Sequence, residues 1–272
     1  MGLRINTNIA ALNANRQLNR TTGRLNKSLE RLSSGLRINR AADDAAGLAI
    51  AEGLGARVRG LRVAQRNAQD GISLVQTAEG ALSETTNILQ RMRELAVQAA
   101  SGTLSTANRS SIQAEVDELL SQIDDIASDT EFNGVVLMTT TTTITIQAGA
   151  DLGQTLAVTI SGADSADLSI NSSFAVSSAA AASTAIQQID SALATVNANR
   201  GTLGAQQNRL EFTINTLAIQ EENSAASESA IRDANIALET IEFTRNQILI
   251  AAGTSILAQA NLVPQTALQL LG

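Results

Sequence analysis

Residues 18–36 read LNRTTGRLNKSLERLSSGL, and leucine recurs in this stretch at the spacing of a helix that packs along one side. The apolar positions fall seven, four, three and four residues apart: Leu18, Leu25, Leu29, Leu32 and Leu36. Nearer the N-terminus three more step in the same way, one position out of phase: Ile5, Ile9 and Leu12. A 3.6-residue helix tolerates that drift, so the pattern predicts a coiled-coil arm that needs a partner.

The other end of the chain carries a second apolar seam. Residues 246–272 contain no charged side chain, but Thr254, Gln259 and Pro264 interrupt the run. It is therefore unlike the roughly 20 predominantly apolar residues of a membrane span. Four apolar residues fall at successive sevens: Leu249, Ile256, Val263 and Leu270. We expect the two seams to pair with each other, and copies of the chain to cover what one copy leaves exposed.

Between the seams the sequence predicts two further helices. Asp43 or Asp44 can cap a helix that runs from about 44 to 100, because a carboxylate there meets unpaired backbone amides. A break follows at 101–103, and a second helix is expected from about 106 to 128. Residues 132–134 (Phe-Asn-Gly) are typical of a turn.

The middle of the chain contains two runs that are rich in β-branched residues. Residues 139–147 (TTTTTITIQ) and 155–161 (TLAVTIS) predict a β-hairpin. Residues 162–182, mostly Ser, Ala and Asp, predict a solvent-facing loop. A helical pattern resumes at about 183 and continues to the end, with irregularities expected at Gly201, Gly204 and 224–229. The fold class predicted is mainly α: an elongated antiparallel helical bundle or coiled coil with a small β-hairpin region.

Composition removes much of the chemistry that enzymes use. The 272 residues include no Cys and no His, and only 1% are aromatic. Thiol nucleophiles, imidazole acid–base chemistry and most transition-metal sites are excluded. Asp43-Asp44 and Asp124-Asp125 could bind a divalent cation, but helix capping and solvated acidic faces explain them better. We predict a structural or interaction protein with no catalytic, cofactor or metal site.

Charge is distributed unevenly along the chain. The total is 19 basic and 26 acidic residues, a formal charge of −7, yet no acid precedes Glu30. A basic arm can indicate nucleic acid or a membrane surface. Here no aromatic residue is available for stacking, so we favour pairing with the chain's own acidic segments or with those of neighbouring copies. Neither nucleic acid nor membrane insertion is expected.

Several segments resemble bacterial flagellin. They preserve the family's order and cover roughly residues 1–160 and 183–272: SSGLRI (33–38), NRAADDAAGLAI (39–50), RNAQDGISLVQTAEGAL (66–82), LQRMRELAVQ (89–98) and TRNQILIAAGTSILAQAN (244–261). The resemblance implies a self-assembling subunit of the flagellar filament. It also implies export of the unfolded chain through the flagellar type III route to the cell exterior, with an export chaperone, a filament cap and hook-junction proteins as partners.

The resemblance further divides the chain into parts. Residues 1–40 and 236–272 would form a paired inner-tube arm, and residues 41–182 and 183–235 would form the outer helical domain. The β-rich middle is only about 40 residues, whereas most members carry a large variable domain there, which implies a thinner and smoother filament. Two alternatives stay open: a hook–filament junction protein of the same superfamily, and an amphipathic lipid-binding helical protein.

One candidate recognition site is also carried over from the family. Arg91 and Leu95 of LQRMRELAVQ, with Glu115 of SIQAE (111–115), match the family's Toll-like receptor epitope. The alternative is that these residues serve lateral packing between subunits.

Overall fold

The computed structural model describes residues 7–170 and 174–269, with side chains as far as Leu262, and it is mainly α-helical as predicted. The described chain forms two compact units, one made of residues 1–56 and 223–272 and the other of residues 57–222. The helices are α1 (Ile9–Ser34), α2 (Ala45–Ala100), α3 (Thr106–Asp129), α4 (Ala179–Arg232) and α5 (Ile236–Gln269).

Short polar residues and one glycine set the helix ends. The Asn8 side chain accepts a hydrogen bond from the Ala11 amide at the start of α1, and Asp44 does the same for the Gly47 amide at the start of α2. Gly35 ends α1 at φ 72°, a conformation that costs glycine little. Asn235 accepts from the Leu238 amide and starts α5 after a break at 233–235.

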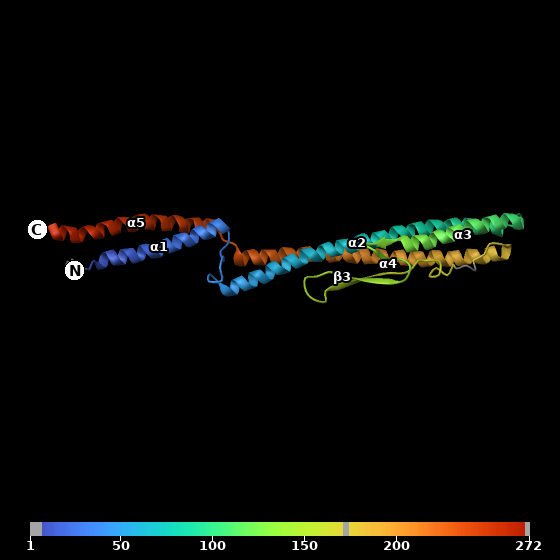
Figure 1. Cartoon of the computed structure of the whole chain (residues 1–272), viewed down its shortest axis with the longest axis horizontal. Helices are drawn as coiled ribbons and strands as arrows, with labels where there is room; N and C mark the ends of the chain where they lie inside the picture. The colour runs from blue at the N-terminus through green and yellow to red at the C-terminus, as the bar shows by residue number, and fades with distance from the viewer. Residues whose placement is uncertain (1–6, 171–173, 270–272) are drawn as a thin grey trace. The chain divides into compact units, whose positions relative to one another are not determined.

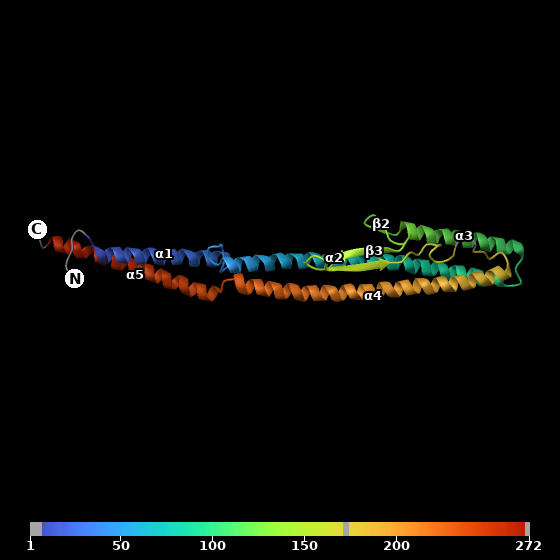
Figure 2. The same cartoon turned by 90° about the horizontal axis from the view of Figure 1, so that it is seen from below.

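The unit of residues 57–222 has one large apolar core and a second, small buried cluster of Leu61, Ala64 and Leu217. Figures 1 and 2 show α3 and α4 running alongside α2. The largest side chains that this core buries completely come from all three helices and include Leu89, Met92, Ile123, Ile189 and Leu210. Helix α4 is continuous through Gly201, Gly204 and 224–229. Around the two glycines, the core holds one face of the helix through Leu203 and Leu210.

Two antiparallel hairpins complete this unit. Strands β1 (Glu131–Phe132) and β2 (Val135–Val136) flank a two-residue turn with positive φ at Asn133 and Gly134. Strands β3 (Thr142–Gln147) and β4 (Thr155–Ile160) form the hairpin predicted from the β-branched segments. Ile146, Leu156, Val158 and Ile160 point into the core, and threonines alternate with them on the exposed face.

Side chains from two helices cover part of the outer edges of the β3–β4 hairpin. Asn67 of α2 donates its side-chain amide to the carbonyl oxygen of Gln147 at 3.1 Å. Gln206 of α4 donates to the carbonyl oxygen of Thr159 at 3.0 Å. An isolated two-stranded hairpin is marginal in water, so packing and these edge hydrogen bonds hold it in place.

The prediction of a solvent-facing loop at 162–182 is wrong. Helix α4 already begins at Ala179, and the segment before it buries Leu168, Ile170, Phe174 and Val176 in the core. Polar residues of α3 fix this segment, since Gln113 accepts from the Val176 amide at 2.6 Å and Asp124 accepts from the Ser165 amide at 2.8 Å. The abundant Ser, Ala and Asp concealed the apolar residues spaced among them.

Candidate assembly surface

Helices α1 and α5 pair antiparallel in the unit of residues 1–56 and 223–272 (Figure 1). Near one end, the Asn8 side chain donates to the carbonyl oxygen of Ala260 at 2.8 Å. Near the other, Arg31 Nη1 lies 3.4 Å from Glu239 Oε2. Between them a Cβ atom on Gly253 would lie 3.3 Å from Leu18 Cδ1, so glycine permits a close approach.

The sides of the two helices that face each other are rows of buried or half-buried residues, spaced alternately by three and four. This is coiled-coil spacing. The row on α1 is Ala11, Ala14, Leu18, Thr21, Leu25, Ser28 and Leu32. The row on α5 is Glu239, Phe243, Asn246, Ile250, Gly253, Leu257 and Ala260.

The centre of this helix pair is polar. Among the described residues of α1 and α5, the fully buried side chains are those of Thr21, Ser28 and Asn246. Thr21 Oγ1 donates back to the carbonyl oxygen of Gln17 at 3.0 Å. The two helices therefore meet through small and polar side chains, with large apolar residues only half-buried around them.

Large apolar side chains lie on the outside of the pair instead. Ten described residues of these helices are exposed: Ile9, Leu12, Leu29, Ile236, Leu238, Ile241, Ile248, Leu249, Ile256 and Leu262. A shallow groove of about 420 Å³ runs along α5, lined by Thr240, Ile241, Thr244, Arg245, Ile248 and Leu249. Exposed apolar patches of this kind mark interaction surfaces. We call these ten residues the outer apolar set.

The structure divides the predicted seam residues between the inner row and the outer apolar set. Leu18, Leu25 and Leu32 lie in the inner row, and Leu36 forms an isolated β-bridge with Asp233. Five are in the outer apolar set: Ile9, Leu12, Leu29, Leu249 and Ile256. Ile5, Leu270 and the side chain of Val263 lie outside the described residues.

The inner rows also differ from the predicted seams in register. Spacing selected Leu29, but Ser28 faces α5 while Leu29 is exposed. On α5 the inner row passes through Ile250 and Leu257, each one residue beyond the predicted Leu249 and Ile256. Residues 248–250 are all apolar, so a sevenfold repeat alone cannot select the inward position.

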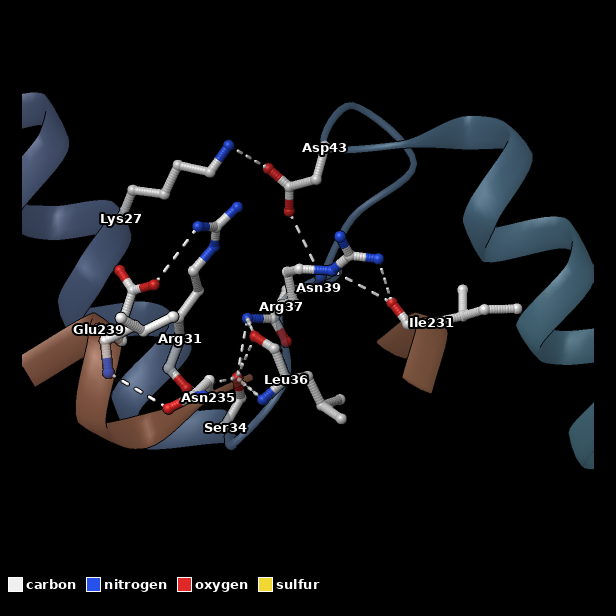
Figure 3. A network of polar contacts seen from close by, with 11 residues as sticks. Lys27, Arg31, Ser34, Leu36, Arg37, Asn39, Asp43, Ile231, Asn235 and Glu239 are labelled. Carbon is white, nitrogen blue, oxygen red and sulfur yellow. Dashed lines mark hydrogen bonds and ion pairs between the residues drawn. The ribbon is translucent and has the colours of Figure 1, made fainter. Parts of the chain in front are cut away.

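A polar network fastens the linker between α1 and α2 (Figure 3). Arg37 donates its backbone amide to the carbonyl oxygen of Arg232 at 2.7 Å, and its Nη2 to that of Ile231 at 2.6 Å. Ala234 returns a hydrogen bond from its amide to the carbonyl oxygen of Gly35 at 2.9 Å. The linker is thereby tied to the break between α4 and α5.

Asp43 makes a second set of contacts within the linker. Its Oδ1 lies 2.7 Å from Lys27 Nζ, and its Oδ2 accepts hydrogen bonds from the amides of Asn39 and Arg40 at 3.3 Å. The hydrogen bond from Lys27 lowers the pKa of the Asp43 carboxyl below its ordinary value, and the two amides add to the effect. The carboxylate form of Asp43 is thus the form that closes the linker.

The basic arm is partly neutralised within its own unit. Lys27 pairs with Asp43 and Arg31 with Glu239. Across the described chain Arg16, Arg20 and Arg24 form no ion pair, and all three are exposed. No carboxylate of the described chain therefore neutralises these three cations.

Only two residues of the candidate recognition site meet at the surface. In the unit of residues 57–222, Arg91 Nη2 donates to Glu115 Oε1 at 2.8 Å, and Arg91 Nη1 lies 3.1 Å from Glu94 Oε2. The hydrogen bond that Arg91 donates to Glu115 raises the pKa of Arg91. Leu95, however, is 2% exposed and belongs to the core, so its side chain lies beneath this surface.

Two kinds of feature are absent among the described residues. They contain no group of three or more Asp or Glu side chains placed to hold a metal ion. None of the helices, over the part that is described, is long and apolar enough to pass through a bilayer.

Sequence reasoning missed the polar inner row and the linker network. A signal for the first was present, because Thr21 and Ser28 continue the spacing of Leu18, Leu25 and Leu32 once polar residues are admitted to the pattern. The linker network depends on carbonyl groups of residues 231 and 232. No side-chain pattern identifies those acceptors.

Comparison with known proteins identifies a family that this chain matches. The model of the bacterial flagellin N-terminal helical region matches residues 5–143, and that of the C-terminal helical region matches residues 186–271. A flagellin of Halalkalibacterium halodurans is 46% identical over 271 residues, covering 98% of this chain and 99% of its own length. A flagellin of Bacillus subtilis is 46% identical over 303 residues, covering 99% and 100%.

A solved structure agrees with these matches. The crystal structure of Bacillus cereus flagellin superposes with a TM-score of 0.50 at 37% identity, covering 60% of this chain and 94% of that one.

Proposed function

Because this chain belongs to the bacterial flagellin family and is a structural subunit of the flagellar filament, we propose that it polymerises through the outer apolar set of its α1–α5 pair. The exposure of ten large apolar side chains on a helix pair with a polar centre carries this proposal. Such a pair gains most of its apolar burial only when another surface covers it.

The free energy available supports assembly. Full burial of one Leu or Ile side chain contributes ~1.5–3 kcal/mol, so covering the outer apolar set would offset roughly 15–30 kcal/mol of the entropy lost in ordering the arms. Contacts between different faces of identical copies do not close on themselves and generate an open helical polymer. We therefore expect arms that are poorly ordered in the free subunit and ordered in the filament.

Amide hydrogen exchange tests this expectation. Backbone amides of residues 1–35 and 240–272 should exchange rapidly in the free subunit and become protected in the filament, while amides near Leu89 and Ile123 stay protected in both. Equal protection of the arms in both states would contradict the proposal, because it would mean that the pair is already stable alone.

A charge substitution tests the surface itself. Ile256 is 59% exposed in the outer apolar set, so Ile256→Asp should leave the free subunit folded and abolish polymerisation. Thr195→Asp, on an exposed position of α4, is the matched control and should polymerise normally. Normal filaments from Ile256→Asp would remove α5 from the assembly surface.

We propose the flagellar type III route for export and an extracellular position for the filament, with an export chaperone, a filament cap and hook-junction proteins as partners. Family membership supports these assignments. Blocking flagellar export in the source cell should retain the subunit inside. Appearance of the subunit outside such cells would point to another route.

For innate immune recognition we propose that Arg91 and Glu115 contact a Toll-like receptor. The support is the exposed Arg91–Glu115 pair together with the family's motif. Arg91→Ala should reduce activation of receptor-bearing reporter cells by monomeric protein, and Arg109→Ala on α3 serves as the comparison. An unchanged response with Arg91→Ala would assign the pair to subunit packing.

A further inference from the structure

Asn246 occupies an unusual position in the α1–α5 pair. It is 4% exposed and is the one buried polar side chain that α5 contributes among its described residues. Its neighbours in the inner row of α5 are Phe243 and Ile250, both half-buried. Burying a side-chain amide costs free energy, because the amide gives up its hydrogen bonds to water. An apolar side chain of similar size would not incur this cost.

The pairing of the helices shows what Asn246 faces. Leu18 lies against Gly253, and Arg31 against Glu239. Asn246 is halfway along α5 between Gly253 and Glu239. It therefore lies level with Leu25, which stands between Thr21 and Ser28 on α1. The amide is thus flanked along α1 by the two hydroxyl-bearing residues of that row.

The apolar residues of α5 do not fix this alignment by themselves. Ile250 and Leu257 are seven residues apart, as are Leu249 and Ile256, so a shift by one heptad replaces one apolar residue with another. The same shift would move Asn246 to the level of Leu18, beside Ala14, or to the level of Leu32, at the end of α1. In either case it would lose one of the two hydroxyl neighbours.

We propose that Asn246, matched by Thr21 and Ser28, is a positioning residue that sets the register along the α1–α5 pair, together with the backbone contacts that join Gly35 and Leu36 to Asp233 and Ala234 at its end. A single buried asparagine sets register in coiled coils because slipped pairings leave its amide against apolar groups, at some expense of stability. Register matters here because it decides which members of the outer apolar set stand beside each other. The inference rests on the proposed function in one respect only: the proposed function assigns polymerisation to the outer apolar set.

Engineered disulfides can read the register directly, since the chain has no cysteine of its own. Ala14→Cys with Leu257→Cys reports the observed register, one helical turn from the Leu18–Gly253 contact. Ala14→Cys with Ile250→Cys reports a one-heptad slip. Each cysteine pair is made in the wild-type, Asn246→Leu, Asn246→Ala and Asn246→Ser backgrounds. Cross-linking is measured on filaments and, at low protein concentration, on free subunits, where a disulfide traps a helix pair that forms only transiently.

We expect the slip reporter to form at most about a tenth as much cross-link as the observed-register reporter in the wild type, and about tenfold more in Asn246→Leu than in the wild type. Asn246→Ala should also raise it, and Asn246→Ser, which keeps a polar group, should keep it low. Gln247→Leu is the matched control, since it adds the same apolar group at an exposed position and should leave the slip reporter unchanged.

No increase of the slip reporter in Asn246→Leu and Asn246→Ala would overturn the proposal, as would an equal increase in Gln247→Leu. Polymerisation of the cysteine-free variants is scored separately by sedimentation. If the wild type fails to polymerise, the proposed function fails, while the cross-link ratios on free subunits still decide the role of Asn246.

Discussion

The two compact units bury opposite kinds of side chain. In the unit of residues 57–222, large apolar residues such as Leu89 and Ile123 are completely buried in one continuous core. In the described part of the unit of residues 1–56 and 223–272, the buried apolar residues are Ile38 and Ala51, and Thr21, Ser28 and Asn246 are buried with them. The first unit can be stable on its own, whereas the second is built to gain its apolar burial from other molecules.

The same substitution made in both units gives the largest expected contrast. Leu89 is 0% exposed, so Leu89→Ala should lower the free energy of unfolding of the free subunit by about 2–5 kcal/mol. Leu249 is 47% exposed, so Leu249→Ala should change it by less than about 0.5 kcal/mol. Urea denaturation followed by circular dichroism measures both.

Leu249 should matter for polymerisation although it contributes little to the stability of the free subunit. Leu249→Ala should raise the lowest protein concentration at which filaments form, because it removes apolar surface from the assembly contact. If Leu249→Ala destabilised the free subunit as much as Leu89→Ala, the contrast between the units would be wrong.

A change in the linker should have a smaller effect, confined to its own unit. Arg37→Ala removes the two side-chain hydrogen bonds to the carbonyl oxygen of Ile231, which together should stabilise the closed linker by about 1 kcal/mol. Faster amide exchange at Arg37 and Ala234, with unchanged exchange near Ile123, is the expected result. Faster exchange in both places would show that the units unfold together.

The linker should also respond to acid. Because the pKa of Asp43 is lowered in the folded state, its contribution is fully present above the ordinary carboxyl pKa and is lost as pH falls through the lowered one. Exchange at the Asn39 and Arg40 amides, corrected for its intrinsic pH dependence, should therefore accelerate in that acid range. Asp43→Asn should remove the acceleration, and its persistence would assign the effect to another group.

The smallest effect is expected at the Arg91–Glu115 pair. Both side chains are about half exposed, and surface ion pairs contribute little to stability. Arg91→Gln should leave the thermal unfolding midpoint of the unit of residues 57–222 nearly unchanged. A large decrease would mean that the pair is part of the packing of α2 on α3.

Much of the architecture was predictable because it depends on local patterns. Helices α2 and α3 and the β3–β4 hairpin lie within a few residues of the predicted ranges, since caps, breaks and β-branched runs mark them. The helical pattern alone runs through the break at 233–235, although Asn235 is an ordinary cap, because apolar residues continue on both sides of it. The boundary at 235/236 comes from the family resemblance. The burial of Phe174 and Val176 was missed because it depends on tertiary contacts with α3.

The assembly surface was harder to predict for a physical reason. Periodicity identifies which residues share one side of a helix, but α5 is apolar on more than one side. The sequence therefore could not tell Leu249 from Ile250, or decide that Ser28 and not Leu29 faces the partner helix. Those choices depend on the close approach that Gly253 and the small residues of α1 permit.

The edge hydrogen bonds from Asn67 and Gln206 have a consequence for a protein whose copies lie side by side in a filament. Threonine-rich strands such as β3 are the kind of segment that stacks into cross-β fibrils when its backbone is open to other chains. Amides reaching over from α2 and α4 occupy one carbonyl on each free edge and hold the strands flat against the helices. Less of the hairpin's backbone is then open to strand pairing between neighbouring copies.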